Sequence, residues 1–243
     1  MMACAVMPRC FKVARQDRRM MSRDEYIARA EAEDDWAPGW DAIEAAFATQ
    51  YPGVEPTHFA TDFADRASLG GTQFIDGYSF YKAADDVQHL VTFGMSDLYA
   101  HEDYFGLEHS GWGYEMTMQI RTDDPFASLW ATNVLSSAAE YTNSRGIWFA
   151  PFEVVGGTGN PFAEGSLINS GVFVADTVMS GIDTLHGRLE FLQFVGLMQD
   201  ELNWIAAEGR DGAPPRAQEL LARMAVDNPR LITDLARTKS YVP

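Results

Sequence analysis

The residues best suited to bind a metal lie between positions 101 and 109. His101 and His109 enclose a segment with three carboxylates, and imidazole and carboxylate groups are the ligands that zinc takes in proteins. No HExxH or HxH spacing places both histidines on one face of a helix or strand. The pattern favours a solvated acidic loop and leaves His101 and His109 as weak candidate ligands of a metal-dependent enzyme.

Two other patterns resemble known catalytic or binding motifs, and each lacks a residue that its motif requires. The Gly-Gly-Thr-Gly run at 156–159 resembles a phosphate loop, but no lysine is near and Asn160-Pro161 follows it. Ser96 follows Gly94-Met95 without the second glycine of a nucleophile elbow. We therefore predict no catalytic residue and no cofactor.

The elements that position these residues alternate between helical and extended patterns. Apolar residues alternate strictly along 112–121, which predicts a strand with one face in the core and the other facing water or a helix. Pro214 and Pro215 predict a linker. Helices are expected at 22–34, 38–51, 125–143, 199–207 and 215–226, and strands at 78–80, 87–93, 112–121, 147–155, 172–174, 189–198 and 231–235. The prediction is an α+β fold: a single domain with a mixed, mostly antiparallel sheet flanked by helices.

Charge divides the chain unevenly. Residues 1–20 hold five basic side chains and one acidic side chain, which gives them a formal charge of +4. Since the whole chain has a formal charge of −17, the remaining residues carry −21. We interpret 1–21 as a basic tail outside the fold and 22–243 as the domain. The acidic body argues against nucleic acid as a partner, and no apolar run reaches the roughly 20 residues that cross a membrane. Both cysteines, Cys4 and Cys10, lie in the tail, which fits a cytoplasmic location.

Several stretches resemble blocks of the Suppressor of fused domain family, in the family's order. The first is Val-Thr-Phe-Gly-Met-Ser-Asp-Leu-Tyr at 91–99, and the second is Ser-Gly-Trp-Gly-Tyr-Glu-Met-Thr at 110–117. Shorter matches lie at 38–43, 51–52, 191–196, 201–202 and 231–234. The resemblance covers residues 38–235.

This resemblance implies a mixed α/β domain that binds a protein and is not an enzyme. Animal members hold a short peptide as an added strand in a cleft between this domain and a second one, and this chain matches the first domain only. Ala100-His101 stands where animal members have Gly-Asp, so their peptide contacts do not carry over. Single-domain bacterial members are proposed to be immunity proteins against secreted toxins.

The two longest blocks supply the candidate partner-binding residues, which are Asp97, Tyr99, Trp112, Tyr114 and Glu115. Each also has a structural interpretation. Asp97 can cap the following turn, Glu115 is either solvated or faces a pocket, and the three aromatic residues are either core or a binding hot spot. The two glycines that flank Trp112 predict a bulge or a close backbone approach.

Three hypotheses follow. The first is a non-enzymatic protein-binding domain with a basic protein or peptide partner, because a negative body steers such a partner. The second is a metal-dependent or other small-molecule enzyme in which His101, His109 and nearby acids converge. The third is an oligomeric structural module that pairs through exposed strand edges near 91–99.

Overall fold

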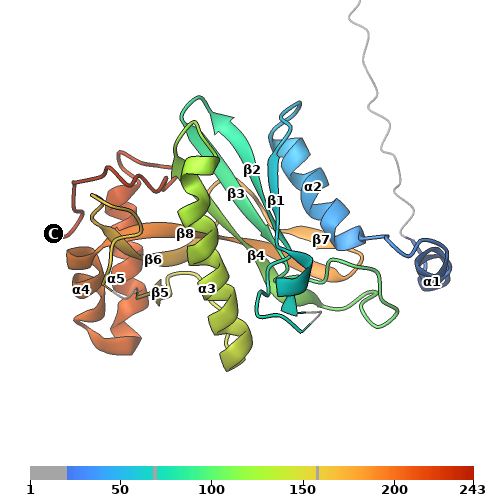
Figure 1. The fold of residues 1–243 in the computed structure, drawn as a ribbon. Helices are drawn as coiled ribbons and strands as arrows, with labels where there is room; N and C mark the ends of the chain where they lie inside the picture. Colours follow the sequence, from blue (N-terminus) through green and yellow to red (C-terminus); the bar gives the residue numbers. More distant parts are fainter. Residues whose placement is uncertain (1–20, 68–69, 157–158) are drawn as a thin grey trace, which may run out of the picture.

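The computed structural model describes residues 21–67, 70–156 and 159–243 (Figure 1). The predicted basic tail, apart from Met21, and the middle of the 156–159 run lie outside the described residues. Within them, no helix is long and apolar enough to cross a membrane.

The described helices follow the predicted order closely. Ser22 begins α1 with a capping box in which Glu25 donates its backbone N–H to the serine hydroxyl and accepts from the Ser22 N–H. Pro38 begins α2 and Gly146, in the left-handed conformation, ends α3. The helices are α1 (Arg23–Ala32), α2 (Pro38–Gln50), α3 (Leu129–Arg145), α4 (Gln199–Ala206) and α5 (Gly209–Met224), with 3₁₀ turns at Phe63–Asp65 and Phe126–Ser128.

The described strands form one eight-stranded sheet. They are β1 (Thr57–Ala60), β2 (Gly77–Ala84), β3 (Val87–Phe93), β4 (His109–Arg121), β5 (Val154–Val155), β6 (Ile168–Ala175), β7 (Ile182–Thr184) and β8 (Gly187–Met198). Their order is β1-β2-β3-β4-β8-β6-β5, with β7 paired to β8 beside this path. The β4–β8 pair is parallel and the others are antiparallel. The predicted mixed, mostly antiparallel sheet flanked by helices is confirmed.

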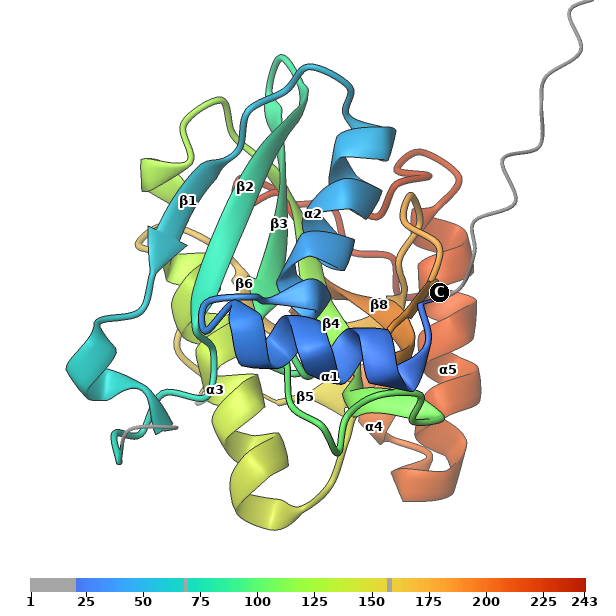
Figure 2. The same ribbon diagram turned by 90° about the vertical axis from the view of Figure 1, so that its right-hand side faces the viewer.

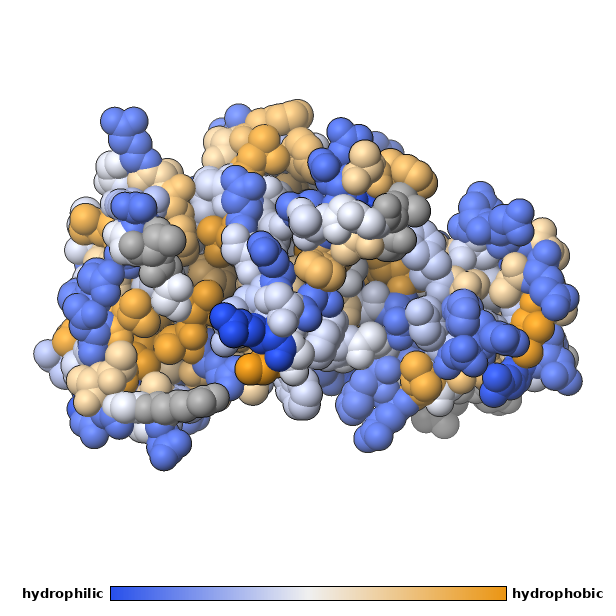
Figure 3. All heavy atoms as spheres, turned by 60° about the horizontal axis from the view of Figure 1, so that its bottom comes forward, coloured by the Kyte–Doolittle hydropathy of each residue, from blue (hydrophilic) through white to orange (hydrophobic). Residues whose placement is uncertain are grey.

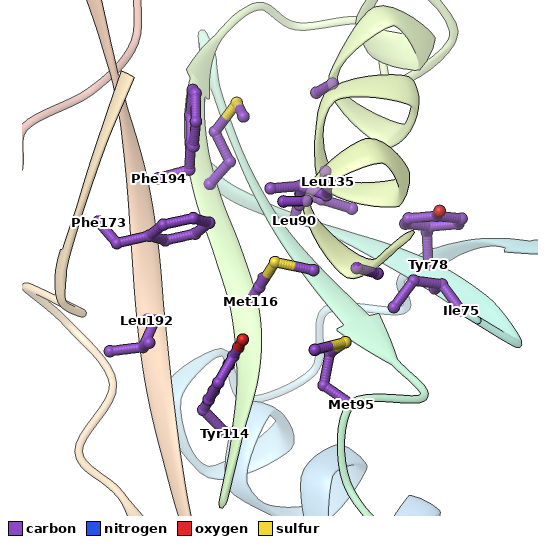
Figure 4. Packing of buried hydrophobic residues seen from close by; sticks show 14 of the residues in the cluster. Ile75, Tyr78, Leu90, Met95, Tyr114, Met116, Leu135, Phe173, Leu192 and Phe194 are labelled. Atoms are coloured by element: carbon purple, nitrogen blue, oxygen red, sulfur yellow. The ribbon is translucent and has the colours of Figure 1, made fainter. Parts of the chain in front are cut away.

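Helices cover both faces of the sheet. On one face α3 packs Ala131, Leu135 and Ala138 against side chains such as Leu90 and Met116 (Figure 4). On the opposite face α2 covers β3 and the start of β8 (Figure 2), while α4 and α5 cover β6 and the end of β8 (Figure 1). The strand β8 is therefore buried on both faces, as its nearly continuous apolar sequence predicts.

The second face of β4 differs from the prediction. Glu115, Thr117 and Gln119 on this face are fully buried, while Arg121 at the end of the strand is exposed. Gln119 and Gln193 of β8 both donate amide hydrogen bonds to the backbone carbonyl of Arg230. The C-terminal segment that contains Arg230 thus covers a polar stripe of the sheet between the α2 core and the α4/α5 core. Neutral amide and hydroxyl side chains of the stripe form hydrogen bonds with the backbone of this segment.

Three element predictions were wrong in part. Pro214 and Pro215 lie inside α5 rather than in a linker, because the apolar residues that follow them pack under α4 and hold the helix together. Of the extended pattern at 147–155 only Val154–Val155 is a strand. The predicted strand at 231–235 is a single bridge between Thr233 and Ile120.

Candidate functional site

Glu115 organises the turn that follows β3. Its carboxylate accepts hydrogen bonds from the backbone N–H groups of Gly94, Met95 and Ser96 at 3.0–3.1 Å, and from the hydroxyls of Ser96 and Thr92 at 2.6 Å. Successive N–H groups in a turn form a concave anion site, and here an internal carboxylate fills it. Glu115 is fully buried, so the expectation that it is solvated or faces a pocket is wrong.

The environment of Glu115 has opposing electrostatic effects. Burial raises the pKa of this carboxyl, while the hydrogen bonds from Gly94, Ser96 and Thr92 lower it and leave a net rise. All the groups around it are donors, so the geometry is made for the ionised acceptor. Glu115 is a structural centre and presents no surface to a partner.

Asp97 joins the turn to the start of β4. Its backbone N–H donates to the Ser110 hydroxyl at 3.0 Å, and its carboxylate accepts from the Gly111 N–H at 2.7 Å. A Cβ on Gly111 would lie 2.7 Å from the carbonyl oxygen of Met95, and the residue has a φ of +54°. The predicted close backbone approach at this glycine is confirmed, and the carboxylate of Asp97 binds β4 instead of capping the turn that follows it.

Tyr99 is the exposed end of the same turn. Its side chain is 45% exposed, and its hydroxyl donates to the carboxylate of Asp76 at 2.9 Å. Arg66 pairs with Asp76 at 3.6 Å and reaches the tyrosine hydroxyl at 3.4 Å. Burial, followed by the hydrogen bond to Asp76, raises the pKa of Tyr99. A phenol ring is thereby held in one place on the surface.

Trp112 and Tyr114 connect β4 to the last turns of α3. The indole N–H of Trp112 donates to the Asn143 side chain at 3.1 Å, and the Tyr114 hydroxyl lies 3.2 Å from that of Thr142. Tyr114 is buried and Trp112 is half-buried. Of the five predicted partner-binding residues, Tyr99 offers an exposed ring, Trp112 and Asp97 are half-buried, and Tyr114 and Glu115 lie inside the fold.

The two candidate metal ligands do not converge. His101 lies 3.7 Å from Asp103, and His109 lies 3.6 Å from Glu108, each at the surface. Among the described residues no group of three or more histidine, cysteine, aspartate or glutamate side chains is placed to hold a metal ion. Since β3 pairs with both β2 and β4, the strand edge that the oligomeric hypothesis needs near 91–99 is also absent from the described sheet.

A buried relay of side chains was not predicted from the sequence. The Tyr51 hydroxyl lies 2.7 Å from Nδ1 of His89, and Nε2 of His89 lies 2.9 Å from the Asp176 carboxylate. Asp176 also accepts from the Thr117 hydroxyl. Burial raises the pKa of Tyr51 to about 12. The relay links α2 to β3, β4 and the segment before β7; its members lie up to 125 residues apart, so no local spacing reveals it.

An apolar groove lies beside α3. The groove has a volume of about 700 Å³ and lies between α3 and the segment that leads into and out of β5. Figure 3 shows hydrophobic side chains gathered around a hollow on this face. Its main walls are Trp130, Val134, Tyr141, Phe149, Val155 and Phe162, with Phe194 at the floor.

The comparisons with known proteins point to one family. The family model for Suppressor of fused protein (SUFU) matches residues 71–238. The human Suppressor of fused homolog is 26% identical over 183 residues, which cover 70% of this chain and 37% of the human protein. The mouse homolog gives the same values. The chain thus spans little more than a third of the length of these curated relatives.

Solved structures agree on the fold. The crystal structure of a Sufu–Fu complex contains a chain that matches with a TM-score of 0.70 at 22% identity, over 84% of this chain and 93% of that one. Drosophila Suppressor of Fused matches with a TM-score of 0.68 at 23% identity, over 84% of this chain and 51% of that one. A SUFU homologue from Neisseria gonorrhoeae matches with a TM-score of 0.56 at 13% identity, over 84% of this chain and 97% of that one.

Fold and motif residues together define a SUFU-type α+β domain, a class whose relatives include a protein solved in complex with a protein partner. The chain belongs to the Suppressor of fused protein (SUFU) family. The two motifs that carry the sequence resemblance are the two segments that Glu115 and Asp97 bind together.

Proposed function

We propose that this chain is a non-enzymatic protein-binding domain that works in the cytoplasm and recognises a basic partner. The observation that carries the proposal is the charge of −21 on residues 21–243 of a domain whose family includes a protein-bound member. A surface of one sign accelerates association with a partner of the other sign, and it also rejects acidic competitors.

The described surface provides places where such a partner can be held. Tyr99 is exposed but fixed by Asp76, so binding costs little side-chain entropy. Trp148 is 61% exposed, and Tyr141, which lines the apolar groove, is 47% exposed. Exposed aromatic side chains on a rigid support are typical of binding hot spots.

We propose further that the partner is a toxin and that this chain is its immunity protein. A basic toxin that acts on nucleic acid has a phosphate-binding surface, and an acidic protein can occupy that surface. Co-expression tests this step: the chain should restore growth of cells that make the cognate toxin. A toxin that remains fully lethal in the presence of folded chain contradicts the immunity role and leaves protein binding untouched.

The protein-binding proposal is tested by affinity capture from the native cell with the tagged chain as bait. Captures at low and at high salt are compared by mass spectrometry, with an uncharged bait of similar size as the control. We expect a basic protein that is enriched at low salt and reduced at high salt, since exposed charges are screened within about 10 Å at 0.1 M salt. Recovery of no specific protein under either condition would overturn the proposal.

A further inference from the structure

The helix α3 separates two cavities of different chemistry. On one side lies the apolar groove of about 700 Å³. On the other side lies a smaller polar pocket of about 340 Å³, which we call the acidic pocket, lined by Asp65, Gln73, Ser136 and Glu140 among others. Asn133 and Ser137 of α3 line both cavities. The two cavities therefore adjoin across the exposed ridge of one helix.

The walls of the groove are held by ring contacts between α3 and the segment around β5. Trp130 stacks on Phe162 with ring centroids 5.6 Å apart, and Tyr141 stacks on Phe149 with centroids 5.8 Å apart. The hollow is therefore a preformed site, of a size that takes one or two large apolar side chains. Asn133, Ser137 and Asn160 supply the polar groups at its rim.

The acidic pocket has a definite charge. Asp65 and Glu140 line it, and within the described residues neither carboxylate has an ion-pair partner within 4.0 Å. No lysine or arginine is among the described residues that line it. Arg66, which follows Asp65 in the chain, donates to the carbonyl of Thr61 and pairs with Asp76. A positive group of a ligand is therefore the complement of this pocket, and a phosphate or an anionic membrane surface is repelled.

We propose that the α3 ridge is the docking surface for an extended segment of the basic partner, which places a large apolar side chain in the groove and a lysine or arginine beside Asp65 and Glu140. The proposal rests on the proposed function and names the surface that performs it. An α-helix with its side chains is about 10 Å wide, and an extended chain advances about 3.3 Å per residue. Successive side chains of an extended chain point to opposite faces, so the two residues must lie an even number of positions apart to face the same surface. The basic residue should therefore lie about four positions from the apolar one.

The probe is a twelve-residue glycine–serine peptide that carries one tryptophan and an arginine four positions further on. Its binding to the ¹⁵N-labelled full chain is followed by NMR, which reports both the dissociation constant and the amides that shift. A second peptide has glutamate for the arginine, and a third has alanine for the tryptophan. We expect shifts along residues 129–145 for the first peptide, and binding about fivefold weaker for the second and about tenfold weaker for the third.

Two variants test the surface from the protein side. Ser137→Trp fills the ridge between the cavities, and Glu140→Arg reverses the charge of the acidic pocket. Ala48→Trp on α2 and Glu31→Arg on α1 are the matched controls, since both positions are exposed and lie on other helices. We expect Ser137→Trp to abolish measurable binding and Glu140→Arg to weaken it about fivefold. Glu140→Arg should also bind the glutamate peptide better than the wild type does.

The outcomes separate this proposal from the proposed function. Unchanged binding in Ser137→Trp, with a melting temperature equal to that of the wild type, overturns the ridge as the docking surface. If a captured native partner binds both variants as tightly as it binds the wild type, the ridge is also overturned as the docking surface. That result leaves the proposal of protein binding intact. Self-association of the wild type that Ser137→Trp removes would make a second copy the occupant and would also overturn the proposal. Failure of the capture experiment alone contradicts the proposed function.

Discussion

At the scale of single residues, the hydrogen bonds to one carboxylate decide whether the motif segments meet. Glu115→Ala removes the acceptor for three backbone N–H groups and two hydroxyls that stay buried. An unsatisfied buried donor costs about 1–3 kcal/mol, so we expect the free energy of unfolding to fall by at least about 3 kcal/mol in urea denaturation.

The control for this variant is Glu190→Ala. Glu190 is exposed and pairs with Arg188 at 2.7 Å, and an exposed pair contributes less than about 1 kcal/mol. Equal losses in the two variants would show that Glu115 does not organise the turn.

A second prediction concerns the acid limb of stability. Burial alone raises the pKa of Asp176, but the hydrogen bond and charge of His89, with the Thr117 hydroxyl and the Met179 N–H, bring it below its ordinary value. Because the pKa of Asp176 is lower in the folded than in the unfolded chain, its ionisation stabilises the fold fully at pH values above the ordinary aspartate pKa of about 3.9. This stabilisation is lost as the pH falls through the lower pKa of the folded state.

The free energy of unfolding of the wild type should therefore fall when the pH is lowered from about 5 to about 3. We expect a smaller fall in Asp176→Asn, which lacks this titrating group. Urea denaturation at both pH values measures it. An equal fall in the free energy of unfolding of both proteins would show that Asp176 does not contribute to the loss of stability in acid.

The sequence could predict the identity of the motif residues but not their roles. Asp97 and Glu115 are candidates because they lie in the two longest blocks that resemble the family, while their partners Gly111 and Gly94 lie 14 and 21 residues away. A surface role and a buried role leave the same local pattern when a polar residue alternates with apolar ones, as Glu115 does along β4. Burial is decided by what covers the strand.

At the scale of elements, the C-terminal segment closes the sheet where β4 and β8 diverge. Thr233 exchanges backbone hydrogen bonds with Gln119 and Arg121 of β4, and its hydroxyl accepts from the Gly196 N–H of β8. Arg237 anchors this segment, because its guanidinium binds the buried Glu201 carboxylate at 2.6 and 2.8 Å. The segment therefore acts as a brace across two strands.

We predict that Arg237→Ala lowers the free energy of unfolding by about 3–5 kcal/mol, because it leaves the buried Glu201 carboxylate without its cationic partner. Lys239→Ala is the matched control: Lys239 pairs with Asp227 at 2.5 Å, but both side chains are exposed, so less than about 1 kcal/mol is expected. Chemical denaturation of both variants checks the difference. A loss below about 1 kcal/mol in Arg237→Ala would contradict the bracing role.

Most elements could be predicted because their signals are local. The capping box of α1, the proline at the start of α2 and the alternation along β4 are each contained in a few residues. The bridge at Thr233 could not be distinguished from a strand, and Pro214 and Pro215 gave a linker signal that core packing of α5 overrides. Tertiary contacts decide both cases.

At the scale of the whole molecule, charge and shape determine what the domain can bind. The negative body was evident in the sequence, and the α3 ridge was not, because its two cavities combine α3 with segments before β2 and around β5. The sequence thus favours a partner of positive charge, and the fold offers the α3 ridge as a surface to bind it. Recognition by charge predicts a partner affinity that depends on salt.

We propose that this acidic SUFU-type domain binds a basic protein. The most direct test is the dissociation constant of the purified native partner, measured by calorimetry at low and at high ionic strength. We expect the dissociation constant to rise with ionic strength, because screening weakens attraction between opposite charges. A dissociation constant that stays the same or falls as salt is added would contradict the claim.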